Sequence, residues 1–322
     1  MIPAPDYAEF LDREYLSTYV KDGGAAVKFV VATDGADATN LSEAIGRRAA
    51  DAGYVVVRID AAVTRVHMME QLFFDLAQQV DWDGLAATAV RAGFAAAGYR
   101  VENAVDGMSA DLTVETVGAT YAVDPLELSR DVNRQLQERI YRDYAMAQEF
   151  RIAMLRLCQA KLGTGQVTEA EHAAVLDWLR GSLRQMSLLR SAMIFRRIGR
   201  HNARQLLFSL AHWLSVNGTS GLLLEIDLRR LGFARRPRPE EREGIYYTKA
   251  ALFDAYELLR QLVDNTDELS NACVIVLASP EFLSDQNRGV HAYQALKLRI
   301  YDEVRDRNRD NPSSSLVRIG AA

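Results

Sequence analysis

Two short runs of apolar, β-branched residues near the start of the chain constrain the fold most strongly. They are residues 27–32 (VKFVVA) and Tyr54–Asp60 (YVVVRID), and residues 41–52 between them carry apolar side chains at helical spacing. The polar stretch TDGADATN precedes this predicted helix, and Gly53 follows it where a helix commonly ends. A strand, a helix and a second strand of this kind form a right-handed crossover in a parallel sheet. The pattern therefore predicts an α/β fold.

Three further apolar runs extend the predicted sheet in the last third of the chain. They are Gly221–Asp227 (GLLLEID), residues 273–278 (CVIVLA) and Leu316–Ile319, and a predicted helix at about 290–307 precedes the last of them. Five strands result. We predict a P-loop NTPase type of fold, AAA+/ORC-like, with a five-stranded parallel sheet flanked by helices.

Helical periodicity replaces the strand signals in the middle of the chain. It extends from about 64 to 215 and includes a predicted helix at about 169–190, while residues 101–125 are weakly patterned and predict a loop. We therefore expect one P-loop-like domain over residues 1–322. Its sheet segments are at about 27–60 and 221–320, and an α-helical insertion lies between them at about 64–215.

Cysteine usage and apolar content bear on the cellular location. Cys158 and Cys273 both lie inside apolar runs, which predicts buried thiols rather than a disulfide or a metal site and suits a reducing compartment. No apolar stretch approaches the roughly 18–20 residues that a membrane span requires, and the acidic start lacks the basic region of a signal peptide. We expect a cytoplasmic protein without a membrane partner. The net charge of −5 excludes a uniformly basic surface, although local patches can still contact nucleic acid.

The polar stretch after the first predicted strand lies where α/β proteins hold phosphate. Backbone N–H groups and the helix dipole converge at such a helix N-terminus. A working P-loop has the pattern G-x-x-x-x-G-K-[ST], whereas residues 32–39 here are A-T-D-G-A-D-A-T. Ala32 and Asp37 replace the two glycines, Ala38 replaces the lysine, and only Thr39 matches. The candidate nucleotide-contacting residues of this stretch are Asp34, Gly35, Ala36, Asp37, Ala38 and Thr39.

These substitutions predict weak or absent ATP binding. One lost charge-assisted contact weakens binding by about 1.5–3 kcal/mol. A carboxylate about 4 Å from a phosphate charge opposes binding by up to about 4 kcal/mol at an effective dielectric constant of about 20. Together these effects would turn micromolar affinity into millimolar or worse. On this motif alone, a polar turn with Thr39 as the helix N-cap is the simpler explanation, because it requires no nucleotide.

Two later strands end in residues that match other parts of a nucleotide site. Asp227 ends an apolar strand as a Walker B acid does, and with Thr39 it would hold Mg²⁺ if a nucleotide bound. Leu228 follows instead of a second carboxylate, and Glu225 lies on the same strand face two residues earlier. Ser279 follows the CVIVLA strand where a nucleotide sensor would lie, although a serine that caps the next turn is an equal explanation.

Arginines are concentrated between residues 195 and 242. Ten arginines face four carboxylates there, in the clusters FRRIGRHNAR and DLRRLGFARRPRPEER. We expect the first cluster on a helix and the second on a loop, where both would meet nucleic-acid phosphates or an acidic partner. Solvated faces with internal ion pairs are the competing explanation. The candidate residues are Arg196, Arg197, Arg200, Arg204, Arg235 and Arg236.

Several stretches resemble the ATP-binding proteins of BREX-type phage-defence systems, the BrxD-like branch of the P-loop ATPases. They include AVKFVVATDGADATNL, GYVVVRIDAAVTRVHMMEQLFFDLA, RRIGRHNARQLLFSLAHWL and DQNRGVHAYQALKLRI. The resemblance implies AAA+/ORC-like ATPases that act with helicases or other defence components on DNA. It assigns the Mg²⁺ hydroxyl to Thr39 and the Walker B acid to Asp227, and it suggests a phosphate or a neighbouring subunit as the target of Arg288. Family members have roughly G-D-Y-G-S-G-K-S at the loop, from which Ala32, Asp37 and Ala38 depart.

Three functions remain open from the sequence. The first is a pseudo-ATPase that serves as a scaffold for a helicase, an ATPase paralogue or another copy of the chain, with DNA as a further partner and at most weak ATP and Mg²⁺ binding. The second is an active ATPase with an atypical phosphate loop that acts with a DNA helicase, and its missing cation comes from Lys28, Arg288 or a partner subunit. The third is a DNA-binding adaptor that uses the arginine clusters without nucleotide chemistry.

Overall fold

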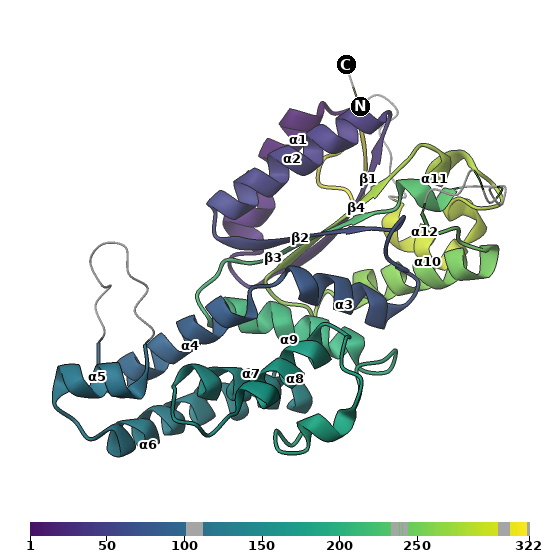
Figure 1. The fold of residues 1–322 in the computed structure, drawn as a ribbon. Helices are drawn as coiled ribbons and strands as arrows, with labels where there is room; N and C mark the ends of the chain where they lie inside the picture. Colours follow the sequence, from purple (N-terminus) through teal and green to yellow (C-terminus); the bar gives the residue numbers. More distant parts are fainter. Residues whose placement is uncertain (101–111, 233–237, 239, 241–243, 302–309, 321–322) are drawn as a thin grey trace. The chain divides into compact units, whose positions relative to one another are not determined.

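A computed structural model describes residues 1–100, 112–232, 238, 240, 244–301 and 310–320 (Figure 1). The chain forms two compact units, one from residues 1–76 and 214–322 and the other from residues 77–213. We call them the sheet unit and the helical unit. Every strand of the described chain lies in the sheet unit, and the regular elements of the helical unit are all helices. That the helical unit is an insertion into a single domain stays a prediction.

The sheet has five parallel strands in the order β2-β3-β4-β1-β5. This arrangement confirms the predicted α/β class and strand number, and it is compatible with a P-loop NTPase fold. Because all five strands are parallel, their carboxyl ends meet at one edge, where the following segments come together. The strands are β1 (Ala25–Ala32), β2 (Tyr54–Asp60), β3 (Gly221–Asp227), β4 (Ala272–Ala278) and β5 (Leu316–Ile319).

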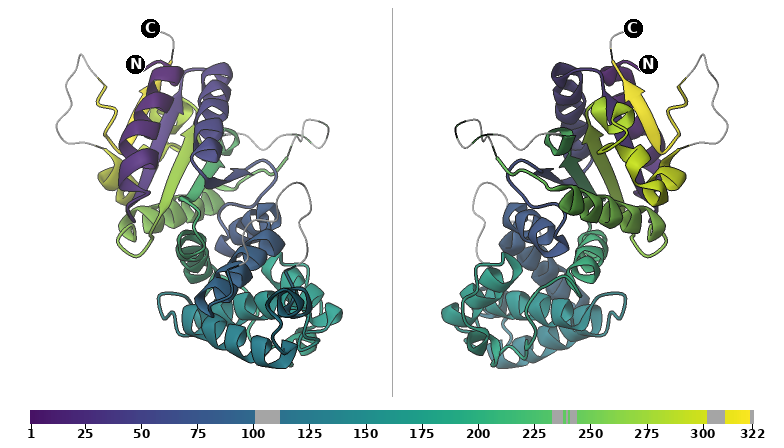
Figure 2. Two further views of the ribbon diagram at one scale, coloured as in Figure 1. Left: turned by 90° about the vertical axis from the view of Figure 1, so that its left-hand side faces the viewer. Right: turned by 90° about the vertical axis from the view of Figure 1, so that its right-hand side faces the viewer.

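Helices cover both faces of the sheet, as the two side views show (Figure 2). On one face, α1 (Ala4–Leu11), the π-helix η1 (Asp12–Tyr19) and α2 (Gly35–Asp51) share a core with the strands. Leu41 and Ile45 of α2 are fully buried in that core. Apolar side chains at helical spacing on α2 therefore meet alternate residues of β1, β3, β4 and β5, which fixes the helix over the sheet.

The opposite face packs against α10 (Lys249–Asp264) and α11 (Glu281–Ser284). Phe29 of β1 stacks on Phe282 at 6.0 Å between ring centroids, and Tyr256 meets Phe282 edge-on at 5.7 Å. The helix predicted at about 290–307 is represented in the described residues by the 3₁₀ helix η6 (Val290–Ala292) and by α12 (Gln294–Ile300). Among the described residues, no helix combines the length and the apolar character that crossing a bilayer requires.

The helical unit is built around pairs of packed helices. Trp82 of α4 (Trp82–Ala96) meets Phe150 of α7 (Gln148–Lys161) edge-on. A side chain at Gly93 would come within 3.2 Å of Leu136, so glycine permits the close approach of α4 and α6 (Pro125–Leu136). Cys158 is buried here and Cys273 is buried in the sheet, as predicted.

The chain passes between the two units within α3 (Met69–Gln79) and α9 (Ala203–Val216). The other elements of this unit are α5 (Val114–Tyr121), the π-helix η2 (Gln137–Tyr141), α8 (Glu169–Leu179) and the 3₁₀ helix η3 (Met186–Leu189).

Two predicted boundaries in the helical unit are wrong for local reasons. Of the loop predicted at 101–125, residues 101–111 lie outside the described residues, and the rest contains α5, which begins at a reciprocal capping box between Thr113 and Thr116. The helix predicted to continue to residue 190 ends at Leu179, because Gly181 adopts a left-handed conformation with φ of 78° and breaks the helix.

Candidate functional site

The connection between β1 and α2 is only two residues long. The helix begins at Gly35, six residues before the predicted start at 41, because Asp34 is its N-cap. The Asp34 backbone is extended (φ −142°, ψ 174°), and its Oδ1 accepts a hydrogen bond of 2.8 Å from the Asp37 backbone N–H. The Thr33 hydroxyl donates to Asp37 Oδ2 at 2.9 Å. The polar stretch that predicted a phosphate loop is therefore the first turn of a helix.

This first turn already satisfies groups that a phosphate would need. Two carboxylates, Asp34 and Asp37, lie at the positive end of the α2 dipole, where a bound anion would otherwise be favoured. The Thr39 hydroxyl, the predicted Mg²⁺ ligand, donates to the Gly35 carbonyl at 2.9 Å within the helix. Asp34, Gly35, Ala36 and Thr39 are exposed to solvent.

Ala38, at the position of the missing lysine, has no solvent exposure. It belongs to the core under α2 together with Leu41 and Ile45. The side chain at this position therefore points toward the sheet. A lysine placed here would have to bury its ammonium group instead of presenting it to a phosphate.

Asp227, the predicted Walker B acid, is held by an arginine two residues further along the chain. Both Asp227 oxygens accept hydrogen bonds from Arg229 Nε at 3.0 Å, and Oδ2 accepts another from Arg229 Nη2 at 2.6 Å. The Arg229 backbone N–H also donates to Asp227 Oδ1 at 2.9 Å. Arg229 starts the 3₁₀ helix η4 (Arg229–Gly232), which turns the guanidinium back onto the end of β3. The acid at this strand end therefore has an internal, multidentate cation partner.

The same guanidinium reaches the start of α2. Arg229 Nη1 donates to the Gly35 carbonyl at 3.3 Å, so one side chain joins β3 to the β1–α2 junction. Hydrogen bonding to Asp227 raises the pKa of Arg229, and the nearby carboxylates Asp60 and Glu225 act in the same direction. A permanent cation of the chain therefore lies at the carboxyl edge of the sheet, between the predicted metal acid and the predicted phosphate turn.

Glu225 lies deeper on the same strand and has its own partners. Its carboxylate is 6% exposed, accepts a 2.7 Å hydrogen bond from the Ser42 hydroxyl and lies 4.0 Å from Arg58 Nε. Burial raises the pKa of Glu225, against the opposing effect of Ser42 and Arg58. A side chain at Gly46 would come within 2.0 Å of Arg58 Nη2, so Gly46 gives the guanidinium its space over α2. The structure places Glu225 in a structural hydrogen-bond network under α2.

Ser279 and Arg288 also have internal partners. Ser279 hydrogen-bonds the Glu281 side chain, which lowers the pKa of Glu281. Arg288 is 5% exposed, and its Nη2 donates to the carbonyls of Tyr247 at 2.7 Å and Leu231 at 3.4 Å. Ser279 and Arg288 line a cavity of about 10 Å³, which has room for about one water molecule. The structure thus gives both residues roles within the fold.

A family model connects this architecture to known proteins. The model for BREX system ATP-binding protein BrxC/D matches residues 12–321, which is nearly the whole chain. The chain belongs to this family. No curated protein and no solved structure matches the BREX-family chain.

The family name implies ATP, and the residues of this BREX-family chain can be compared with what Mg-ATP requires. A triphosphate needs free backbone N–H groups, a cation facing the loop, and a carboxylate and a hydroxyl available to Mg²⁺. Here Asp34 caps the helix, position 38 faces the core, Thr39 donates to the helix backbone, and Arg229 holds Asp227. These residues do not fit Mg-ATP in the manner of a working P-loop.

The first arginine cluster of the BREX-family chain is not helical, which corrects the prediction. Arg196, Arg197 and Arg200 lie in an irregular segment before α9, and of the four predicted residues only Arg204 is inside that helix. All three arginines of the irregular segment are exposed. Arg235 and Arg236 lie outside the described residues.

Arg229 is a residue of this site that the sequence pattern did not indicate. In the sequence it is one member of an arginine-rich cluster. A usable signal is its spacing, because an arginine two residues after an acid that ends a buried strand can turn back onto that acid. Its second partner, the Gly35 carbonyl, is 194 residues away in sequence and has no local signal.

Proposed function

We propose that the chain is a pseudo-ATPase subunit of a BREX phage-defence system, an AAA+/ORC-like scaffold without effective ATP hydrolysis. Membership of the BREX ATP-binding family supports the role in phage defence. The main support for the loss of catalysis is that Arg229 donates hydrogen bonds to both carboxylate oxygens of Asp227. Under this proposal the partners are other components of the defence system, such as a helicase or an active ATPase paralogue.

The energetics favour a scaffold over an ATP site. Mg²⁺ would have to displace a guanidinium that makes charge-assisted hydrogen bonds, and each of these contributes about 1.5–3 kcal/mol. The phosphates would also approach Asp34 and Asp37. Each carboxylate at about 4 Å opposes one phosphate charge by up to about 4 kcal/mol at an effective dielectric constant of about 20. These terms are together large enough to remove micromolar binding.

The competing function, an ATPase with a cation supplied from elsewhere in the chain, finds little support in the two candidate residues. Lys28 is 4% exposed, donates to the Ser313 carbonyl at 2.6 Å and lies over the Tyr15 ring at 4.3 Å. It is also five residues before Thr33, about 16 Å along an extended strand. Arg288 donates to two backbone carbonyls. A partner subunit would have to supply the cation, and the Arg229 contact would still have to break.

Phosphate release from Mg-ATP tests this proposal directly. The wild-type chain and an Asp227→Asn variant should both release phosphate at the rate of the protein-free background, because Asp227 is a structural ion-pair partner. Circular dichroism of both proteins verifies that they are folded. Turnover by the wild type that disappears in Asp227→Asn would refute the proposal, since only a catalytic or metal-binding acid gives that pattern.

A further inference from the structure

A long acid-free stretch begins in the helical unit and continues into β3. Residues 179–224 contain no aspartate or glutamate, and seven arginines fall between residues 180 and 204. Five of these arginines are exposed, so the segment presents positive charge to solvent. We call residues 184–200 the arginine segment. Its exposed arginines are Arg184, Arg190, Arg196, Arg197 and Arg200.

Local packing makes the arginine segment present apolar side chains as well. Ala192 and Ile194 are fully buried, whereas Met193 is 58% and Phe195 is 65% exposed. Buried Ala192 and Ile194 anchor the backbone on either side of Met193, where the chain turns. The Trp178 indole N–H donates to the Arg196 carbonyl at 2.9 Å and fixes the segment to α8. Two large apolar side chains are therefore held outward at a defined place.

Met193 is held there in an unfavourable backbone conformation. Its φ is 61°, in the left-handed region that residues other than glycine adopt rarely. This conformation ends the helical turn that follows η3, because the Ile194 backbone N–H donates to the Leu189 carbonyl at 3.2 Å and the Met193 N–H donates to the Arg190 carbonyl at 3.1 Å. The neighbours Ala192 and Ile194 are buried and anchor this turn. Met193 is thus exposed at the end of a hydrogen-bonded turn.

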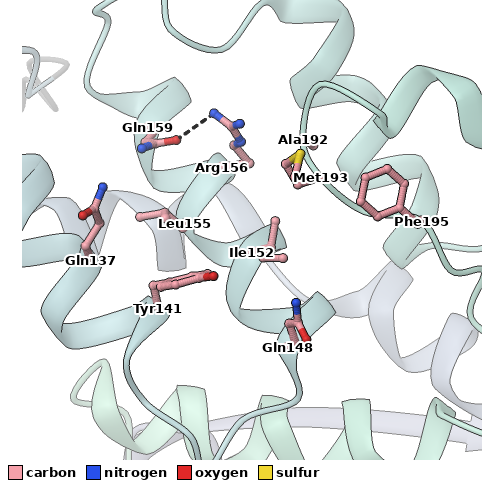
Figure 3. A pocket seen from close by; sticks show the side chains of 10 residues that line it. All are labelled: Gln137, Tyr141, Gln148, Ile152, Leu155, Arg156, Gln159, Ala192, Met193 and Phe195. Carbon is pink, nitrogen blue, oxygen red and sulfur yellow. Dashed lines mark hydrogen bonds between the residues drawn. The ribbon is translucent and has the colours of Figure 1, made fainter.

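Met193 and Phe195 form one side of an open groove of about 490 Å³ within the helical unit (Figure 3). Ile152 and Leu155 of α7 lie between them and Tyr141, which stands on the other side. The volume is in the range of sites that accept a few side chains of a ligand. The exposed amides of Gln137 and Gln148 also line the groove, where they can pair with a peptide backbone. The groove is therefore apolar inside and polar at its border.

Charge is distributed unevenly around this groove. Arg156 is the single cation among its described lining residues, and it is engaged by the Ser191 carbonyl at 2.9 Å and by Glu171 at 3.4 Å. The exposed arginines lie outside the groove, on the segment that carries Met193 and Phe195. Arg196 has a Glu149 oxygen at 3.6 Å, but its side chain is 72% exposed and such a surface pair is weak. A nucleic-acid strand would need cations along the groove itself, whereas an apolar floor with flanking cations suits an acidic peptide.

We propose that this groove binds an acidic peptide segment of a protein partner. Apolar side chains of the peptide pack on Ile152, Leu155 and Phe195, and its carboxylates pair with arginines of the arginine segment, such as Arg196 and Arg197. The inference goes beyond the proposed scaffold function because it names the binding surface and the chemistry of the partner. It is also independent of the nucleotide question, since no residue of the sheet unit takes part.

A display library of random 12-residue peptides, selected against the intact chain, tests the proposal. Enriched peptides should have net negative charge and at least two large apolar residues. The best of them, labelled with fluorescein, should bind at least tenfold more weakly to Met193→Gly, to Phe195→Ala and to Arg196→Glu/Arg197→Glu. Met193→Gly separates binding from folding, because glycine accepts the left-handed backbone and the variant should unfold at a temperature no lower than the wild type.

Matched controls use residues of similar exposure away from the groove. Leu126→Ala removes a side chain that is 70% exposed, and Arg13→Glu reverses an exposed charge in the sheet unit. Both should leave peptide affinity within about twofold of the wild type. The proposal is overturned by a library that gives no enrichment, by enriched peptides without acidic excess, or by affinities that ignore Met193 and Phe195. It is also overturned if a 20-base-pair DNA duplex binds to the wild type but not to Arg196→Glu/Arg197→Glu, and leaves the bound peptide in place. The two arginines would then bind DNA and not the peptide.

Discussion

Arginines serve opposite purposes at the sheet edge and in the helical unit. At the sheet edge, Arg229 gives its donors to Asp227 and to the Gly35 carbonyl. In the helical unit, Arg196, Arg197 and Arg200 remain exposed in a stretch of sequence without acids. The first region pairs its guanidinium with a carboxylate within the fold. In the second region the guanidinium groups stay largely exposed, although Arg196 lies 3.6 Å from Glu149 and Arg197 donates to the Arg184 carbonyl at 2.9 Å.

Under the two proposals made above, this difference separates a closed sheet edge from an accessible binding surface. A nucleotide site needs unsatisfied donors and acceptors that wait for a ligand, and the sheet edge has filled its own with Arg229, Asp34 and Asp37. An interaction surface needs accessible groups, and the arginine segment keeps them exposed together with Met193 and Phe195. By composition alone these arginines form one basic region. Their surroundings divide them into Arg229, which is bonded to Asp227, and the exposed arginines of the arginine segment.

The largest effect is expected from Ala38→Lys, which restores the lysine of a working P-loop. Because Ala38 is fully buried, the ammonium has no solvent or partner, and the free energy of unfolding should fall by about 4 kcal/mol or more. Chemical denaturation measures this. Ala36→Lys, at an exposed position in the same turn, is the control and should change stability by less than about 1 kcal/mol. A stable Ala38→Lys protein that gains ATP affinity would contradict the contrast between the two regions, because the sheet edge would then be open to a ligand.

The next effect concerns the ion pair at the sheet edge. Arg229→Gln and Asp227→Asn should each lower the free energy of unfolding by about 2 kcal/mol, because each leaves a partly buried charge without its partner. The double variant should lose less than the sum, with a coupling of about 1–2 kcal/mol in a double-mutant cycle. Additive losses would mean that the two residues do not act as a pair.

A smaller, pH-dependent effect is expected at Glu257 of α10. Hydrogen bonding to Arg260 lowers the pKa of Glu257 to about 2, with further help from Tyr293 and Gln261. The folded carboxyl has a pKa below its unfolded value of about 4.3, so its contribution is complete above that pH and is lost as pH falls toward about 2. The difference in unfolding temperature between the wild type and Glu257→Gln should therefore be largest near neutral pH. A difference that stays constant down to pH 2 would contradict this ion pair.

The smallest effect on stability is expected in the arginine segment. Arg196→Ala and Arg197→Ala should change the free energy of unfolding by less than about 0.5 kcal/mol, because both side chains are exposed. Denaturation of these variants beside Arg229→Gln compares the two regions directly. A loss near that of Arg229→Gln would place the segment among the internally satisfied arginines.

The sheet was predictable because its strands are buried on both faces. Continuous apolar runs predicted β2, β3 and β5 at their observed bounds, and β1 and β4 within two residues at one end. The start of α2 was not predicted, because the stretch TDGADATN indicates a turn unless one recognises that Asp34 alone caps the helix. The helix predicted for Arg196, Arg197 and Arg200 was wrong, since the chain turns at Met193 and the Arg196 carbonyl accepts its hydrogen bond from the Trp178 indole instead of a helical N–H.

The candidate site was predictable in position and less so in its interactions. Sequence placed Asp227 and the 32–39 stretch at the same edge, and parallel strands bring them there. Whether Asp227 is available depends on the rotamer of Arg229 and on a carbonyl from a distant element. The burial of Ala38 likewise depends on the early start of α2, which turns that side chain onto the sheet. Such properties come from tertiary packing and have no signature in spacing alone.

Thermal unfolding with and without about 1 mM Mg-ATP tests the central claim, that the chain fills its own nucleotide site. A micromolar site would gain about 4 kcal/mol of stability at roughly 1,000 times its dissociation constant, and unfolding would shift upward by several degrees. Our account predicts a shift of less than about 1 °C for the wild type. A rise of several degrees that is lost in Asp227→Asn would contradict it, because Asp227 would then serve a bound nucleotide instead of Arg229.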